Sequence, residues 1–300
     1  MIRLLKVFTF VLITTIISFL IPEPVELLTD LNTLISTMRK HFWWITCVCM
    51  LLSITMINWR TANANRSTAP LQAASSAKDL FEKYVDDLYQ AAELQQTGLD
   101  EVVFKKAVTG FINLKMANRL PQNSSIITVV DLNKPSREKR MWIVDLVAKH
   151  LLLNTWVAHG QGSGDDVANS FSNINDSHQS SLGFYLTDDV YMGKHGRSLH
   201  LDGLDEGFND DARAREIVVH GAPYVSERTI NEKGKIGRSW GCPAVSPKVS
   251  NEVIDDIKGR TVFFINGNDD NYNSKYLNED LSAAYIFPAD TTANRLASLQ

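Results

Sequence analysis

The spacing of hydrophobic and polar positions changes along this chain of 300 residues, and the change separates two kinds of structure. In residues 80–120, apolar side chains recur every three or four positions. This spacing predicts a helical hairpin with helices at about 77–96 and 99–117, on either side of Gly98. After Pro121, short runs of β-branched and aliphatic residues alternate with turn residues, which is typical of strands.

The strand runs are short and closely spaced, so they predict a mainly β domain, a sandwich or a barrel, over residues 123–268. The expected strands are 125–132, 141–146, 151–158, 182–186, 198–201, 217–219 and 261–265. One helix is expected among them at about 246–257, because Ser246 and Pro247 resemble an N-cap and a first helical position. A polar tail at 269–300 completes the predicted domain order.

The N-terminal part holds two apolar runs, 7–21 and 42–57, each shorter than the roughly 20 residues that cross a bilayer comfortably. The second run is typical of a signal peptide, because the basic segment 39–41 precedes it and an Ala-x-Ala site ends at Ala64. We therefore expect translation from Met38, cleavage after Ala64 and export of the remaining chain.

The alternative is that residues 1–64 anchor the chain through two membrane segments. Arg39 and Lys40 would then lie outside, against the tendency of basic residues to stay on the cytoplasmic side, so this topology is disfavoured. In either case residues 65–79, rich in Ala, Ser, Thr and Asn, predict a linker with no core to bury.

Composition narrows the class of protein. Hydrophobic residues make up 44% of the chain and charged residues 21%, which is typical of a globular domain. The net charge of −4 shows no basic excess, so nucleic acid is not an expected partner. Cys47 and Cys49 lie in the second apolar run, which leaves Cys242 as a lone cysteine: unpaired, linked to another chain, or reactive.

The surroundings of Cys242 favour the reactive thiol. Gly241 can adopt positive φ and expose its N–H, and Pro243 fixes the direction of the chain beyond the thiol. A nucleophilic cysteine needs such N–H groups and also a base, since its thiol is mostly protonated at neutral pH. His220, at the end of a predicted strand, is the candidate base. The alternatives are a buried packing cysteine and a histidine that caps a strand.

These residues belong to a motif, His220-Gly221 followed by Gly237-x-Ser239-x-Gly241-Cys242. The motif resembles the signature of the L,D-transpeptidase catalytic domain, the YkuD-like fold of bacterial cell-wall enzymes. Longer strings across roughly 80–266 resemble one branch of that family, the murein L,D-transpeptidase catalytic-domain-like proteins. These strings are 157–160, 181–185, 195–199, 201–204 and 218–224.

The resemblance implies a β-rich domain whose cysteine forms a thioester with a peptidoglycan stem peptide. The peptide would be cut after its meso-diaminopimelate or equivalent L-centre, and the acyl group would pass to an amine of another stem or to a protein lysine. In this chain the resemblance makes Cys242 the nucleophile, His220 the base and the Gly221 carbonyl the group that orients the imidazole.

The resemblance also implies an oxyanion hole lined by N–H groups of Gly241, Cys242 and Trp240, with Ser239 in the same turn. The common family motif carries a histidine and an arginine where this chain has Trp240 and Ala244. Recognition of a substrate carboxylate therefore needs other residues. The candidates for substrate binding are Arg238, Arg215, Tyr224 and His195.

No cofactor or metal is expected, because the histidines follow no zinc pattern such as His-Glu-x-x-His. The acidic residues between 202 and 211 lack the calcium-loop pattern, which predicts a solvated acidic loop. His159-Gly160 and His195-Gly196 are expected in turns that rim the cleft. The segment between His220 and Cys242 is expected to cross one wall of the cleft as a mobile flap.

Two other functions stay open from the sequence. An L,D-carboxypeptidase or hydrolase would use the same thioester with water as acceptor, and a catalytically silent domain would only bind the cell wall. All three predict stem peptides as partners and a place in the periplasm or cell envelope, with N-terminal membrane association open. An enzyme further requires the sulfur of Cys242 and the ring of His220 to meet, although 22 positions separate them.

Overall fold

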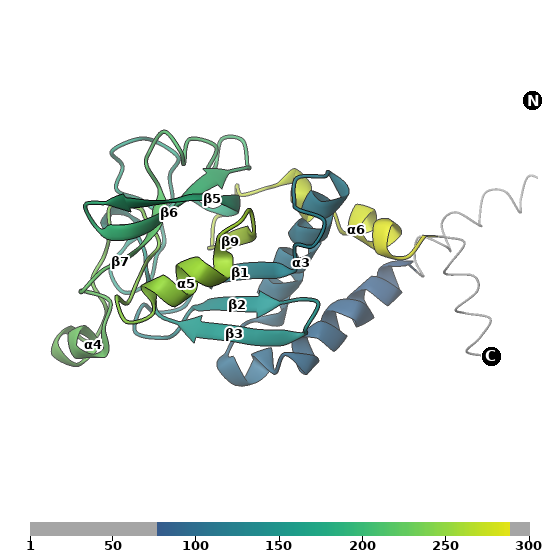
Figure 1. Cartoon of the computed structure of the whole chain (residues 1–300), viewed down its shortest axis with the longest axis horizontal. Coiled ribbons are helices and arrows are strands. Elements are labelled where there is room, and N and C mark those ends of the chain that lie inside the picture. The colour runs from purple at the N-terminus through teal and green to yellow at the C-terminus, as the bar shows by residue number, and fades with distance from the viewer. Residues whose placement is uncertain (1–76, 289–300) are drawn as a thin grey trace, which may run out of the picture. The chain divides into compact units, whose positions relative to one another are not determined.

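The computed structural model describes residues 77–288 (Figure 1). The predicted apolar runs, the cleavage site and most of the linker lie outside them. Among the described helices, none is long and apolar enough to cross a membrane. The described part begins with a helix over 77–91, followed by the 3-10 helix η1 (Leu94–Thr97) and by α3 (Glu101–Met116). These helices lie where the hairpin was predicted.

Local signals fix the turn between these helices. Gly98 takes φ 74° after η1, a left-handed conformation that glycine adopts without strain. Two residues later, the side chain of Asp100 accepts hydrogen bonds from the N–H groups of Val102 and Val103. This N-cap satisfies donors that the first turn of α3 would otherwise leave unpaired.

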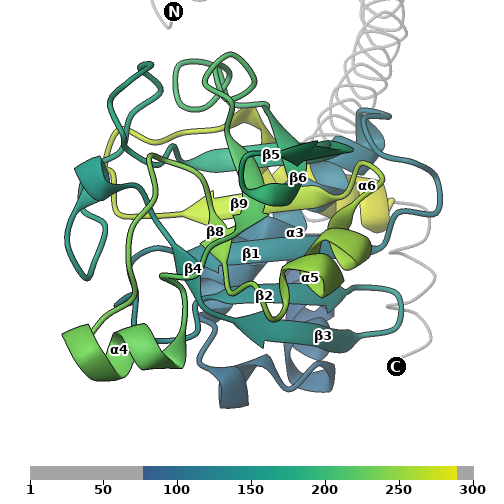
Figure 2. The same ribbon diagram turned by 60° about the vertical axis from the view of Figure 1, so that its left-hand side comes forward.

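Nine strands form one hydrogen-bonded sheet in the order β3-β2-β1-β9-β5-β6-β7-β8-β4 (Figure 2). They are β1 (Ile126–Asp131), β2 (Met141–Asp145), β3 (His150–Thr155), β4 (Val157–Ala158), β5 (Gly183–Gly193), β6 (Gly196–Gly203), β7 (Val218–Gly221), β8 (Ala244–Val245) and β9 (Val262–Asn266). The outermost strands, β3 and β4, are separated in sequence only by Trp156, so the sheet must curl around a common interior. The predicted mainly β domain with preceding helices is confirmed.

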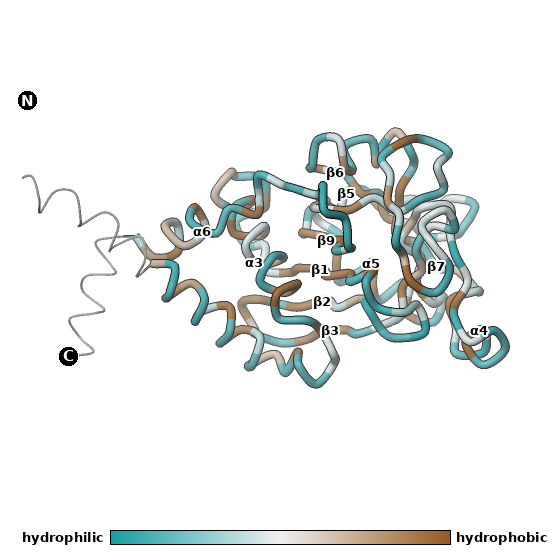
Figure 3. The backbone as a smooth tube through the Cα atoms, turned by 180° about the vertical axis from the view of Figure 1, so that it is seen from behind, coloured by the Kyte–Doolittle hydropathy of each residue, from teal (hydrophilic) through white to brown (hydrophobic). Residues whose placement is uncertain are grey.

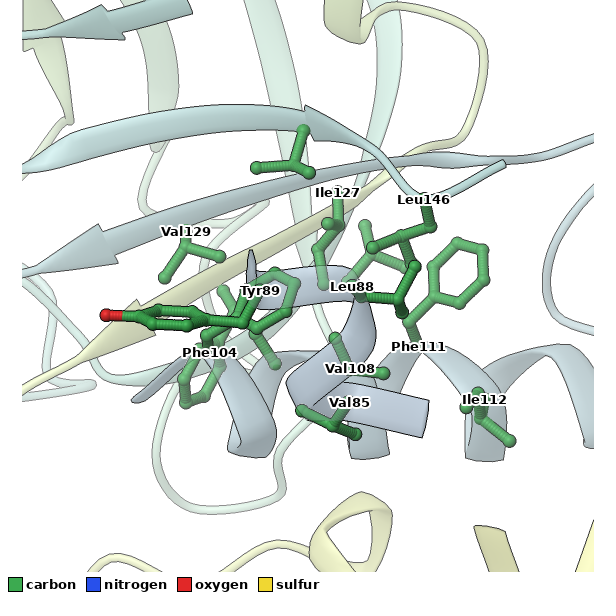
Figure 4. Packing of buried hydrophobic residues seen from close by; sticks show 14 of the residues in the cluster. Val85, Leu88, Tyr89, Phe104, Val108, Phe111, Ile112, Ile127, Val129 and Leu146 are labelled. Carbon is green, nitrogen blue, oxygen red and sulfur yellow. The ribbon is translucent and has the colours of Figure 1, made fainter. Parts of the chain in front are cut away.

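One face of the sheet is covered by the helices. Leu88, Phe104 and Phe111 from the helices pack against Ile127 and Leu146 from the sheet side (Figure 4). Helical spacing brings the apolar side chains of α3 onto one stripe, and alternation along β1 supplies the facing row. The helical hairpin is therefore part of the same hydrophobic core as the sheet.

The other face encloses a second core that α5 (Ser250–Ile257) covers. Val253, Ile254 and Ile257 of α5 are fully buried against residues such as Val130 and Phe263. Figure 1 shows α5 and α3 on opposite sides of β1, and Figure 3 shows hydrophobic residues along β1 and β9, between the two layers. The strands that carry the candidate site, β7 and β8, extend from this second core.

The structure corrects several details of the prediction. The helix expected from Ser246 begins only at Ser250, because residues 246–249 form a turn and Val249 provides no side-chain cap. A second helix, α4 (Glu227–Lys233), occupies the segment expected to be a flap, and the Ser226 side chain caps it. The strand β8 has only two residues, too few to give a pattern.

The predicted polar tail is partly structural. It contains the 3-10 helix η3 (Lys275–Leu277) and α6 (Glu279–Ile286), which pack against α3. The Asn113 side chain donates to the carbonyls of Tyr276 and Asn278, at 2.8 and 2.9 Å. A few buried residues among polar ones are enough to dock this segment on α3. Its apolar residues show no clear helical period, so the sequence did not predict the helix.

Candidate active site

Cys242 lies at the end of a tight turn that precedes β8. The Ser239 hydroxyl holds this turn, because it accepts from the Gly241 N–H at 3.1 Å and donates to the Cys242 carbonyl at 2.6 Å. Gly241 takes φ 123°, and a Cβ there would lie 2.8 Å from the Gln179 carbonyl oxygen. Only glycine fits at this point, so the local geometry depends on the residue types around the thiol.

His220 lies near the end of β7 and is buried. Its Nδ1 is 3.0 Å from the Gly221 carbonyl oxygen. A carbonyl only accepts hydrogen bonds, so Nδ1 carries the hydrogen and the lone pair is on Nε2. The structure thus gives the imidazole the tautomer that leaves Nε2 free to accept a proton.

The sheet brings His220 and the segment that directly follows Cys242 to neighbouring strands. β7 and β8 are parallel, and His220 pairs with Ala244, two residues beyond Cys242. No hydrogen bond joins the Cys242 sulfur to the His220 ring in the described part of the chain. The thiol Sγ instead donates to the Glu216 carbonyl at 3.6 Å. Proton transfer therefore requires the thiol to rotate away from that carbonyl.

Electrostatics keep both groups neutral in this arrangement. Burial raises the pKa of the Cys242 thiol, and the backbone of Val218 and the charges of Arg215 and Lys194 oppose that shift. Burial lowers the pKa of His220, with the Gly221 hydrogen bond opposing it and the neighbouring His195 and Lys194 adding to it. The pair is thus a thiol and a neutral imidazole, an arrangement that suits general-base activation of the thiol.

The oxyanion donors differ from the set that the resemblance implied. The Gly241 N–H already donates to the Ser239 hydroxyl. Within residues 77–288, the N–H groups of Trp240 and Cys242 have no hydrogen-bond acceptor. These two N–H groups are therefore available to donate to a negatively charged oxygen of a ligand.

The structure brings three of the four candidate substrate-binding residues close to Cys242 or His220. The His195 ring stacks on the His220 ring with centroids 4.3 Å apart. Burial and the nearby Cys242 raise the pKa of Tyr224 to about 12. Arg215 is close enough for its charge to act on the thiol. Arg238 points elsewhere, because its Nη1 donates to the Gly164 carbonyl at 2.7 Å.

Several residues at the site were missed from the sequence. Lys194 forms the tip of the β5–β6 hairpin with His195, and its Nζ lies 5.7 Å from the Trp240 ring centroid. A second neighbour of Trp240 is His178, whose ring stacks on the indole with centroids 4.9 Å apart. Gly193 and Gly196 around the Lys-His pair signalled a turn, yet nothing local indicated that this turn reaches β7.

Two further expectations are wrong. His159 does not rim a cleft: it is buried, its Nδ1 accepts from Arg140 at 2.6 Å, and burial lowers its pKa to about 4. The acidic loop is not wholly solvated either, since Asp205 is buried and accepts from Tyr272 and Ser274. In both cases a polar side chain found its partners inside the fold, as buried polar groups must.

The described residues contain no group of three or more His, Cys, Asp or Glu side chains placed to hold a metal ion. The groups that the structure places at this site are a thiol, an imidazole and two free N–H donors.

Comparisons with known proteins bear on this geometry. A family model described as the L,D-transpeptidase catalytic domain matches residues 95–266. Among solved structures, an L,D-transpeptidase from Mycobacterium smegmatis is 12% identical, with 48% of this chain and 59% of that chain covered and a TM-score of 0.31. The chain thus spans about three fifths of that protein.

Two other solved structures resemble the chain. An L,D-transpeptidase from Stackebrandtia nassauensis is 14% identical, covers 64% of this chain and 93% of its own, and has a TM-score of 0.30. The helical cell shape determining protein Pgp2 from Campylobacter jejuni is 10% identical, with 60% and 63% covered and a TM-score of 0.35. No curated protein sequence matches the chain.

Proposed function

The chain belongs to the L,D-transpeptidase catalytic-domain family, and from this premise we propose that it transfers acyl groups between peptidoglycan stem peptides through a thioester on Cys242. The observation that carries the proposal is the His220 ring, fixed by the Gly221 carbonyl at 3.0 Å on a strand beside the one that follows Cys242. A general base held in one tautomer next to a thiol in a glycine turn suits acyl transfer.

In the first half of the reaction, the thiol of Cys242 gives its proton to Nε2 of His220 as the sulfur attacks the carbonyl carbon of the L-centre. The N–H groups of Trp240 and Cys242 would stabilise the negative charge on the carbonyl oxygen. The carbon–nitrogen bond then breaks, and the leaving amine takes the proton from the imidazolium. The products are a thioester and the released C-terminal residue of the donor.

In the second half, an acceptor amine attacks the thioester and loses a proton to Nε2 of His220. The carbon–sulfur bond breaks, and the thiolate takes the proton back from the imidazolium. The enzyme returns to its thiol and neutral imidazole forms, which is the pair that the raised pKa of Cys242 and the lowered pKa of His220 favour at rest.

The test is incubation of the full chain with a disaccharide-tetrapeptide and analysis of the products by mass. A cross-linked dimer supports transfer to an amine, whereas the tripeptide alone means that water is the acceptor and the protein is a hydrolase. The Cys242→Ala variant should form neither product. The matched control replaces Cys47 and Cys49 with alanine and should keep full activity, because Cys242 is then the sole cysteine.

A carbapenem separates an enzyme from a silent wall-binding domain. An active thiol should open the β-lactam and gain one covalent adduct at Cys242, which intact mass measurement detects. If Cys242 gains no carbapenem adduct although iodoacetamide still labels it, acyl chemistry at this site is contradicted.

We also propose that the working protein is exported, because peptidoglycan lies outside the cytoplasmic membrane. Export rests on the signal-like pattern before Ala64, in residues outside those described. N-terminal sequencing of the protein from its own cell should find a start near Asn65. An intact Met1 would favour the membrane-anchored alternative.

A further inference from the structure

Two cationic side chains next to Cys242, Arg215 and Lys194, form no ion pair in the described part of the chain, although the acidic Glu216 also acts on the thiol. Arg215 and Lys194 both act on the thiol, and both favour its charged form. Within the described residues neither side chain has a carboxylate within 4.0 Å. Unpaired positive charge beside a reactive group is typical of a site that receives an anionic part of its ligand.

The hydrogen bonds of Arg215 show that its role is indirect. Its Nη1 donates to the Ser172 carbonyl at 2.7 Å, and its Nη2 donates to the Gln179 carbonyl at 2.7 Å. The hydroxyls of Ser181 and Ser177 take the remaining directions at 3.3 Å. Both terminal nitrogens are thus fully engaged, so Arg215 contributes a fixed positive charge behind the site.

Arg238, the other arginine near the cysteine turn, is already neutralised. Its Nη1 donates to the Gly164 carbonyl and lies 3.6 Å from an Asp165 carboxylate oxygen. Lys235 forms an ion pair with the same aspartate. These contacts hold the basic side chains of this segment away from the thiol.

Lys194 is the cation with free donors. It is exposed at the tip of the β5–β6 hairpin, it forms no hydrogen bond or ion pair in the described structure, and its Nζ lies over the ring of Trp240. The other residue of the same tip, His195, stacks on His220. The two residues of this tip therefore contact both parts of the site: His195 contacts the base on β7, and Lys194 contacts the turn that carries the nucleophile.

We propose that Lys194, backed by the fixed charge of Arg215, binds the terminal carboxylate of the acyl-donor peptide and so selects donors that end one residue beyond the scissile bond. This inference rests on the proposed function. In such a donor, the carboxylate is three covalent bonds from the carbonyl carbon that the sulfur attacks. Lys194 lies over the ring of Trp240, two residues before Cys242, and its neighbour His195 stacks on His220, so the ammonium is suitably placed to bind that carboxylate. Lys194 would then recognise the substrate carboxylate in a chain that has Ala244 where the common family motif has an arginine.

A carboxylate bound at Lys194 would also affect the base. The positive charge of Lys194 lowers the pKa of His220, so a carboxylate that pairs with Lys194 would remove part of that effect. His220 would become a stronger base only when a donor with a free C-terminus is bound. Binding and activation are thereby coupled through one side chain.

The test measures binding apart from turnover, in the Cys242→Ala background. Calorimetry compares a disaccharide-tetrapeptide that has a free C-terminal carboxylate with the same compound as its C-terminal carboxamide. The free acid should bind more tightly, and Lys194→Met should remove roughly tenfold of that advantage, the effect of one lost hydrogen bond to a charged group. Binding of the carboxamide should stay the same, and Lys194→Arg should retain the preference.

Lys106→Met is the matched control, because Lys106 is exposed on α3, the helix that packs against β1 and α6. If the Cys242→Ala protein that keeps Lys194 binds the acid and the amide equally, or binds neither, the proposal of a carboxylate subsite at Lys194 is wrong. A different result is that the protein with its natural Cys242 binds the free acid more tightly through Lys194 and yet turns over no peptide. That result would support the carboxylate subsite and overturn the proposed function.

Discussion

The helix-covered face of the sheet and the end that carries Cys242 are built in different ways. The first is held by side chains of repeating character, such as Phe104 and Phe264, whose partners are other apolar groups. The second is held by single hydrogen bonds and close backbone approaches, such as Ser239 to Cys242 and Gly241 against Gln179. The helix-covered region therefore tolerates any apolar residue of suitable size, whereas the region around Cys242 depends on residue identity.

The largest expected effect separates stability from site chemistry. Phe264 lies in the central strand β9, stacked on Phe184 at 4.4 Å, so Phe264→Ala should lower the free energy of unfolding by about 3–5 kcal/mol. Denaturant titration measures this loss. Iodoacetamide labelling of Cys242 in native buffer, with Cys47 and Cys49 replaced by alanine, should keep its rate, because the folded site is unchanged. A large change in that rate would mean that the two regions are not separate.

The second effect concerns the buried pair of His159 and Arg140. Burial lowers the pKa of His159 to about 4, while the unfolded chain takes up this proton at the ordinary histidine value. The unfolded state therefore binds more protons between these two values, and stability should fall as pH is lowered from 7 to 4. The loss is on the order of 3 kcal/mol.

His159→Gln should remove that loss, which urea unfolding at pH 7 and pH 4 measures as a smaller difference between the two conditions. His150→Gln is the control, because His150 is exposed on β3. Other titrating groups, including the buried Asp205, are the same in all three proteins, so they cancel from the comparison. An unchanged difference in His159→Gln would show that this histidine is protonated in the folded protein.

Two glycine substitutions, one in each region, compare directly how overpacking affects stability and the reactivity of Cys242. A Cβ on Gly110 of α3 would lie 2.0 Å from the Phe184 ring, and one on Gly160 would lie 2.3 Å from the His178 carbonyl oxygen. Each alanine variant should lose about 1–3 kcal/mol of stability through overpacking. Only Gly160→Ala should also slow the reaction of Cys242 with a carbapenem, because the displaced loop carries His178 and Gln179 beside the cysteine turn. Equal slowing in both variants would contradict this distinction.

The same contrast explains what the sequence predicted. The helices at 77–91 and in α3, and strands such as β1 and β2, show apolar residues at regular spacing, so period and turn residues were enough to find them. The two-residue strand β8 is too short to show a hydrophobic period. The helical period of the α6 segment is too weak to predict a helix. Their structure is decided by pairing with β7 and by docking on α3.

For the site, the motif pointed to the cysteine turn and to the histidine, since glycine, proline and a strand end carry local meaning. It did not point to Lys194 or His178, which approach from elsewhere in the chain. Their positions follow from the register of the β5–β6 hairpin and from hydrogen bonds of the loop near Ser180. Such distant contacts have no signature within a sequence window.

The smallest effect tests whether the charges around Cys242 act in the directions that the structure gives. Burial raises the pKa of the thiol, Lys194 opposes this shift, and Glu216 adds to it. Glu216→Gln should therefore lower the pKa of Cys242 and speed iodoacetamide labelling at pH 7, and Lys194→Met should slow it. Each change should be about twofold, because both charges are exposed to solvent, and it should shrink in high salt. Changes of the same sign in both variants would mean that packing, and not charge, controls the thiol.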